Sequence, residues 1–150
     1  MESNFKRSLA LVLLSEGGNT DNPADHGGRT SRGITQTEYN AWCREHGKAQ
    51  IDVFLAPDTD IEFIYHSEYW LPWCPAFPIG VDYLYFDMAV NSGPYRAAIL
   101  LQRALGVIAD GRIGPITRRA VQTTDPTSLI SRYSEAKRAF YLSLHQPAFT

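Results

Sequence analysis

Apolar residues recur at helical spacing along almost the whole chain, and this periodicity constrains the fold more than any other feature. The first stripe consists of Phe5, Leu9, Val12 and Leu13, and two glycines follow it as a helix stop. Further helices are expected from the capping box at Thr35 to Gly47, from Asp58 or Thr59 to Pro72, around 84–92, from Ser92 and Pro94 to Gly106, from Pro115 to about Gln122, and over about 127–145. The sequence therefore predicts a mainly α fold of about seven helices.

Strand signals are nearly absent from the sequence. The exception is the stretch from Gly17 to Ile34, which is rich in Gly, Asn, Asp and Thr. Such a composition is typical of tight turns and of close backbone approach to a ligand. We therefore expect a small irregular hairpin or a folded loop directly after the first helix, which makes the fold α+β with helices dominant.

The composition is that of one soluble domain, because 44% of the 150 residues are hydrophobic and 20% are charged. The longest apolar run, Leu9–Leu14, is too short for a bilayer span or for a signal-peptide core. Cys43 and Cys74 lie outside any zinc-like spacing, and the four histidines are scattered. Both cysteines are therefore interpreted as buried thiols, and neither a metal site nor a cofactor is expected.

Charge is distributed unevenly along the chain. Residues 1–95 carry six Lys/Arg and thirteen Asp/Glu, a net charge of −7, whereas residues 96–150 carry eight and three, a net charge of +5. A basic half is typical of proteins that meet a polyanion, but Arg residues also serve simply to solvate helices. Nucleic acid is not the expected polyanion, because no nucleic-acid-binding motif is present and the pI is about 6.0.

One carboxylate occupies an unusual position. Glu16 lies four residues after Val12 and three after Leu13, so it continues the apolar stripe of the first helix. A carboxyl at the edge of a core is desolvated, and a pKa raised to about 6 would let it donate a proton to a glycosidic oxygen near neutral pH. The alternative is a helix-end Glu that points into solvent.

A second carboxylate follows at Asp25, nine residues after Glu16. A chain reversal at Asn22-Pro23 would bring the two acids to opposite sides of a cleft. Glycoside hydrolysis needs such a pair, with one acid on the leaving oxygen and one base or stabiliser on the other face of the sugar. Asp21, by contrast, is interpreted as a turn-capping residue.

Motifs spread along nearly the whole chain point to a known family. They are Glu16-Gly17-Gly18 with Asp21, Pro23, Asp25, Gly27-Gly28, Thr30 and Gly33-Ile34-Thr35; Tyr65 to Trp70; Phe86 to Gly93; and Leu101-Gln102 to Leu105-Gly106, Asp110-Gly111, Ile113-Gly114-Pro115 and Thr117. Together they resemble the bacteriophage and prophage endolysins with an E-G-G motif, which are lysozyme-like N-acetylmuramidases with a C-terminal peptidoglycan-binding segment. The resemblance implies one lysozyme-like domain over 1–150, in which residues 92–150 form an integrated peptidoglycan-binding helical part.

The resemblance also implies roles for individual residues. The family's catalytic acid corresponds to Glu16, and Asp25 would orient the water or stabilise charge. A wider group of phage lysozymes has a Thr that holds the water at the position where this chain has Ser31. The residue that holds the water here could therefore be Thr30, Ser31 or Thr35, and Thr30 is preferred. The residues assigned to substrate binding are Gly28, Thr35, Tyr39, Asp87 and Asn91. Asp87 and Asn91 share one helix face, and the interpretation we prefer is that they brace the loop holding Glu16.

The implied activity is hydrolysis of the β-1,4 bond between N-acetylmuramic acid and N-acetylglucosamine in bacterial peptidoglycan, which causes lysis of the host cell. Two alternatives stay open: a lytic transglycosylase that acts on the same bond, and a wall-binding module without catalysis. The expected protein is a monomer, made in the host cytoplasm without a visible signal peptide, that acts in the periplasm after holin-type release. Its expected partner is peptidoglycan, with no nucleic acid and no transmembrane segment.

Overall fold

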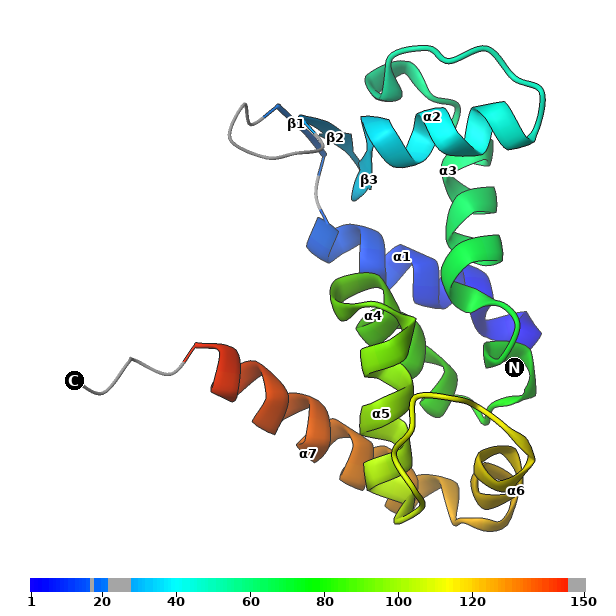
Figure 1. The fold of residues 1–150 in the computed structure, drawn as a ribbon, viewed down its shortest axis with the longest axis vertical. Helices are drawn as coiled ribbons and strands as arrows, with labels where there is room; N and C mark the ends of the chain where they lie inside the picture. Colours follow the sequence, from blue (N-terminus) through cyan, green and yellow to red (C-terminus); the bar gives the residue numbers. More distant parts are fainter. Residues whose placement is uncertain (17, 22–27, 146–150) are drawn as a thin grey trace. The chain divides into compact units, whose positions relative to one another are not determined.

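The computed structural model describes residues 1–16, 18–21 and 28–145 and is mainly helical (Figure 1). The α-helices are α1 (Phe5–Glu16), α2 (Gln36–Glu45), α3 (Asp58–Tyr65), α4 (Val81–Ser92), α5 (Pro94–Leu105), α6 (Pro115–Thr123) and α7 (Pro126–Leu144). The strands are β1 (Asn19–Asp21), β2 (Arg29–Ser31) and β3 (Ile34–Thr35), and short 3-10 helices cover Glu2–Asn4, Val53–Leu55 and Cys74–Ala76. For the described residues, the expected mainly α fold with a small hairpin after the first helix is confirmed.

The chain forms two compact units, one of Lys6–Glu68 and one of Met1–Phe5 together with Tyr69–Thr150. The boundary near the middle of the chain falls inside a π-helical segment, His66–Trp70, that directly follows α3. The expectation of one lysozyme-like domain over 1–150, with residues 92–150 integrated into it, stays a prediction.

A three-stranded antiparallel sheet lies in the unit Lys6–Glu68. Its middle strand is β2, in which Thr30 pairs with Thr20 of β1 and with Thr35 of β3. The turn between β2 and β3 has positive φ at Arg32 and Gly33, 51° and 79°. Two successive positive φ angles are the geometry that joins twisted strands through a two-residue turn.

The helix α2 begins with Thr35 as its N-cap, the position that the predicted capping box assigns to it. The hydroxyl of Thr35 accepts a hydrogen bond of 3.1 Å from the backbone N–H of Glu38. At the other end, the ring of His46 stacks on Trp42 with 4.6 Å between centroids, and His46 Nδ1 lies 2.8 Å from Trp42 O. His46 therefore packs against the last turn of its own helix.

The start of α3 differs from the prediction. Asp58 or Thr59 was expected to be the N-cap, but Pro57 occupies that position and Asp58 is the first helical residue. The Asp58 carboxylate accepts an ion-paired hydrogen bond from Arg32 in the hairpin turn. The carboxylate expected to cap the helix thus has a partner that is distant in the sequence.

In the other unit, α4, α5 and α7 pack against one another and α6 packs on α5 (Figure 1). The buried side chains of this core include Tyr85, Phe86, Met88, Ala97, Ala98, Leu100, Leu101, Leu129 and Tyr133. The hydroxyl of Tyr133 donates a hydrogen bond of 2.9 Å to Ala97 O, which joins α7 to α5 inside the core. Gly93, at φ 88°, ends α4 and is the N-cap of α5 in place of the expected Ser92.

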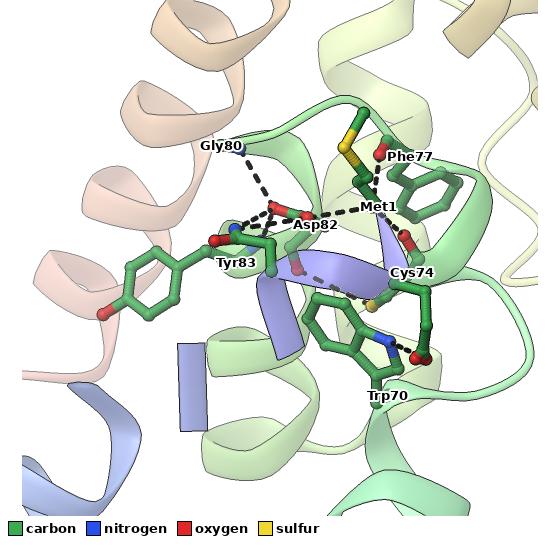
Figure 2. A network of polar contacts seen from close by, with 9 residues as sticks. Met1, Trp70, Cys74, Phe77, Gly80, Asp82 and Tyr83 are labelled. Carbon is green, nitrogen blue, oxygen red and sulfur yellow. Dashed lines mark hydrogen bonds and ion pairs between the residues drawn. The ribbon is translucent and has the colours of Figure 1, made fainter. Parts of the chain in front are cut away.

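A buried carboxylate organises the start of α4 (Figure 2). Asp82 is 0% exposed, and one of its oxygens accepts from the backbone N–H groups of Gly80 and Tyr83 at 3.0 and 2.6 Å. The same oxygen lies 3.1 Å from Asn4 Nδ2. The second oxygen pairs at 2.9 Å with the ammonium group of Met1, which also donates to two backbone carbonyls. These contacts join the first residues of the chain to α4.

Both cysteines are buried thiols, as the sequence predicts. Cys43 and Cys74 are each 0% exposed and unbridged. Burial raises the pKa of the Cys74 thiol above its ordinary value, because the thiolate would be desolvated. Neither cysteine contributes to a disulfide framework.

Candidate functional site

Glu16 ends α1 beside the turn that joins β2 to β3. A Cβ added at Gly33 would lie 3.1 Å from Cγ and 3.1 Å from Oε2 of Glu16, and it would overlap the hydroxyl of Tyr65. The turn therefore needs a glycine at this position, because φ is 79° and the Tyr65 hydroxyl and the Glu16 carboxylate leave little room for a side chain. Glu16 is partly buried, so it is not the fully solvated helix-end residue of the alternative interpretation.

The turn beside Glu16 is held from two sides. The hydroxyl of Tyr65 donates a hydrogen bond of 2.6 Å to Arg32 O. The guanidinium of Arg32 donates in the other direction, to Ala56 O at 2.8 Å and to the carboxylate of Asp58. The turn that borders the acid is therefore fixed, and defined surroundings are what a catalytic carboxyl requires.

Three hydroxyls are candidates for the water-holding role, and the structure gives two of them other partners. Ser31 is 1% exposed, and its Oγ accepts from Arg32 Nε at 3.0 Å. Thr35 Oγ1 caps α2 through Glu38. Thr30 lies at the centre of β2 and is partly exposed. This arrangement favours Thr30, whose role stays a prediction.

The loop before β2 carries two more predicted site residues. Asp25, the expected second carboxylate, lies outside the described residues. Gly28 directly precedes β2 at φ 64°, a conformation that favours glycine. The catalytic role of Asp25 and the substrate contact of Gly28 stay predictions.

An ion-pair cluster anchors the first residue of β2. Arg29 donates from Nε and Nη2 to the two carboxylate oxygens of Asp52 at 3.0 and 2.9 Å, and from Nη1 to Asp21 at 3.1 Å. Its guanidinium lies 3.7 Å from the centroid of the Phe54 ring. The pKa of Asp52 lies below its ordinary value because the N–H of Phe54 and then Arg29 stabilise the charged form. The strand that carries Thr30 is thereby attached to residues 52–54.

Tyr39, assigned to substrate binding from the sequence, belongs to the core of its unit. Its side chain is 1% exposed, and its hydroxyl donates to Asp60 Oδ2 at 2.8 Å. The other oxygen of Asp60 pairs with Lys48 at 2.7 Å. Burial and then the bond to Asp60 raise the pKa of Tyr39, so the hydroxyl stays a donor. These contacts give Tyr39 a packing role, and its assignment to substrate binding stays a prediction.

Asp87 and Asn91 form a pair on one face of α4, as their spacing predicts. Asn91 Nδ2 donates to the backbone oxygen of Asp87 at 2.8 Å and to its Oδ1 at 3.1 Å. The second carboxylate oxygen of Asp87 pairs with Lys137 of α7 at 2.8 Å. One contact of this pair that the structure describes therefore runs from Asp87 to α7, and the bracing of the loop that holds Glu16 stays a prediction.

Sequence reasoning missed two neighbours of predicted site residues, namely Lys137 beside Asp87 and Gly33 beside Glu16. Lys137 falls in the apolar stripe of the last helix, and its side chain is 9% exposed. A buried lysine needs an anionic partner, so its position in the apolar stripe already indicates a buried ion pair. Gly33 lies in a motif that the sequence analysis quoted, but its contact with Glu16 comes from the fold.

The described residues form neither a metal-binding cluster nor a membrane-spanning helix. In residues 1–16, 18–21 and 28–145, no three His, Cys, Asp or Glu side chains gather in a way that could hold a metal ion. None of the helices in that part of the chain combines the length and the apolarity needed to cross a membrane.

Comparisons with known proteins agree with the family resemblance. Residues 9–93 match the family model described as Glycosyl hydrolase 108, and residues 96–148 match one described as "Predicted Peptidoglycan domain". A solved structure described as "Structure of Brucella abortus SagA" is 32% identical, with a TM-score of 0.78, over 97% of this chain and 83% of that chain. No curated protein matches.

The hydrolase match covers more than half of the chain and includes most of the predicted site. Glu16 and Thr30 lie within it, as do Asp87 and Asn91. The second match covers the basic, helical end of the chain, so that a hydrolase segment and a peptidoglycan-binding segment follow one another. The chain therefore belongs to the glycosyl hydrolase 108 family of lysozyme-like N-acetylmuramidases.

Proposed function

We propose that this chain is an endolysin that cleaves the β-1,4 bond between N-acetylmuramic acid and N-acetylglucosamine and thereby lyses bacterial cells. The observation that carries the proposal is the position of the Glu16 carboxyl. It lies at the end of α1, partly buried, against Gly33 and next to a turn held by Tyr65 and Arg32. This is the placement that a general acid needs.

In the proposed reaction, the protonated carboxyl of Glu16 donates its proton to the glycosidic oxygen as the bond to the muramic acid carbon breaks. An oxocarbenium-like charge develops at that carbon. Asp25 stabilises the charge or orients the attacking water, and Thr30 holds that water. Two carboxyls about 5–5.5 Å apart would give retention of configuration, and a separation of about 6.5–9.5 Å would give inversion.

The charge of the chain supports a cell-wall substrate. Residues 96–150 carry a net charge of +5, and they include the segment that matches the peptidoglycan domain. The stem peptides of peptidoglycan are anionic, and a basic surface raises the local concentration of an anionic polymer. The chain would then act in the periplasm after passing a holin-type pore.

The test is the clearing of bacteria whose outer membrane has been permeabilised. We expect Glu16→Gln to abolish clearing while the protein still sediments with insoluble cell walls, because the amide cannot donate the proton. Glu45→Gln is a matched control, since Glu45 is exposed at the end of α2. A Glu16→Gln protein that clears cells at the wild-type rate would disprove the proposal.

The mass of the released fragments separates hydrolysis from transglycosylation. Hydrolysis adds a water molecule to each cleaved bond, whereas a lytic transglycosylase closes a ring and leaves products lighter by one water. We expect the heavier, hydrolysed products. Ring-closed products would replace the muramidase proposal by the transglycosylase alternative while leaving Glu16 as the acid.

A further inference from the structure

We propose that a pocket between the α5–α6 loop and the start of α6 binds the stem peptide of peptidoglycan. The inference rests on the proposed function for the identity of the polymer, and it names which part of that polymer is recognised and where. The pocket has a volume of about 280 Å³ and lies wholly within residues 107–117. It is therefore inside the segment that matches the peptidoglycan domain.

Aliphatic side chains make the walls of this pocket. Ile108 and Ile116 line it and are 83% and 75% exposed. Val107 and Pro115 line it beside them. One exposed isoleucine is ordinary on a protein surface, but two that border the same pocket form a contact area that the core does not use.

A buried glutamine holds the loop in shape. Gln102 is 1% exposed, and its Nε2 donates to Arg112 O at 2.8 Å and to Asp110 Oδ1 at 3.0 Å. Its Oε1 accepts from the N–H of Gly111 at 2.9 Å. At φ 80°, Gly111 packs directly against the ring of Tyr95. The pocket is therefore formed before any ligand arrives, which lowers the entropic cost of binding.

The charged groups of the pocket indicate the sign of the ligand. The Asp110 carboxylate is engaged within the loop, since it accepts from Gln102 and from the N–H of Arg112 at 2.9 Å. Arg112 is exposed and lines the pocket. Arg118 and Arg119 follow on α6 and are exposed as well. Asp110 and Arg112 balance in formal charge, so the net positive charge of this region comes from Arg118 and Arg119, and it attracts carboxylates.

Aliphatic walls with a cation at the rim fit a short peptide better than a sugar. The stem peptide of peptidoglycan presents alanine methyl groups next to carboxylates, which match the isoleucines and Arg112. Sugar sites commonly offer an aromatic ring to a sugar face, and the residues that line this pocket in the described chain are not aromatic. The chemistry therefore selects the peptide part of the wall polymer.

The test measures binding to insoluble peptidoglycan, with every variant made in a Glu16→Gln chain so that the polymer is not cleaved. We expect the double variant Ile108→Ser/Ile116→Ser to bind about tenfold more weakly, since both side chains would lose their apolar contact. Arg112→Ala should weaken binding and reduce its dependence on salt. Leu55→Ser is the matched control, because Leu55 is a 73% exposed apolar residue of the other unit. Circular dichroism of each variant verifies that it is folded.

A second arm uses peptidoglycan from which an amidase has removed the stem peptides. We expect the parent chain to bind these bare glycan strands about as weakly as the double variant binds intact walls. Equal binding to bare and intact polymer, or a folded double variant that binds intact walls as the parent does, would overturn the inference. Because both arms measure binding and not cleavage, these results do not depend on whether the wild-type chain proves to be a muramidase.

Discussion

The side chain of Glu16 lies so close to Gly33 that a Cβ at Gly33 would be 3.1 Å from Glu16 Oε2. Glu16 ends α1, whereas Gly33 belongs to the turn between the second and third strands. The shape of this turn therefore determines the space in which the acid sits. Tyr65 and Arg32 hold the turn that borders the acid.

Gly33→Ala should lower the rate of wall clearing strongly and the free energy of unfolding only modestly. The substitution costs about 1–2 kcal/mol of unfolding free energy, because Gly33 has a φ of 79°. The added methyl group also displaces Glu16 or Tyr65. The control is Gly47→Ala, where φ is 65° and the space around the glycine is open. Urea unfolding and turbidity assays of both variants measure the two effects, and equal activity losses would contradict the prediction.

Lys137→Met should destabilise the unit that contains α4 and α7. Removing the ammonium leaves the largely buried Asp87 carboxylate without its cation, at a cost of about 3 kcal/mol. Arg138→Met, at the exposed neighbouring position, should change stability by less than about 0.5 kcal/mol. Urea unfolding curves test this difference, and equal midpoints for the two variants would refute the role of the Asp87–Lys137 pair.

Asp82→Asn should be among the most destabilising single-atom changes in the chain. The substitution removes the negative charge that pairs with the ammonium group of Met1. It also replaces one carboxylate oxygen by an NH2 group, which cannot accept from the donors that surround Asp82. We expect a loss of about 3 kcal/mol. Asp125→Asn, at the exposed N-cap of α7, is the control, because Asn caps helices as well as Asp does. Thermal unfolding should separate the two variants by several degrees.

Acid should remove the stabilisation that Asp110 provides. The pKa of Asp110 lies below its ordinary value because the N–H of Arg112 and then Gln102 donate to the charged carboxylate. A carboxyl with a lowered pKa stabilises the folded state above its unfolded pKa of about 3.9, and loses this effect as pH falls through the folded value. The stability gap between wild type and Asp110→Asn should therefore be full near neutral pH and shrink below about pH 4. Urea unfolding across this range measures the gap, and a constant gap would contradict the assignment.

The two thiols should be inert in the folded protein. Cys43 and Cys74 are 0% exposed, and the pKa of Cys74 is raised by burial. The thiolate is the reactive form, so a thiol-specific reagent should label neither residue until the chain unfolds. Labelling with and without denaturant, followed by mass spectrometry, tests this. Rapid labelling of either cysteine in the native protein would show that its packing is looser than described.

Most of the helices could be predicted because their signals are local. The predicted helix from Pro94 to Gly106 is α5, Pro94–Leu105, with Gly106 in the left-handed conformation as its stop. The capping box at Thr35 likewise begins α2. Apolar spacing, caps and glycine stops act over about one helical turn, so a single sequence is enough to recognise them.

Contacts between distant elements were less predictable. Pro57 takes the N-cap position expected for Asp58, and the Asp58 carboxylate pairs with Arg32 of the hairpin turn. The partner of Asp87 is Lys137, which is far away in the sequence and on another helix. Sequence spacing places two such residues on helix faces but does not say which faces meet.

Short-range patterns in the sequence thus predict the helices and the hairpin after the first helix, and the motifs identify the family. Only the tertiary structure decides what lies next to each charged group. The turn at Gly33 lies beside Glu16, Lys137 pairs with Asp87, and Asp82 at the start of α4 pairs with the ammonium group of Met1. The reason is physical. A hydrogen bond or an ion pair depends on a distance of about 3 Å between two atoms, and packing of the whole chain determines that distance.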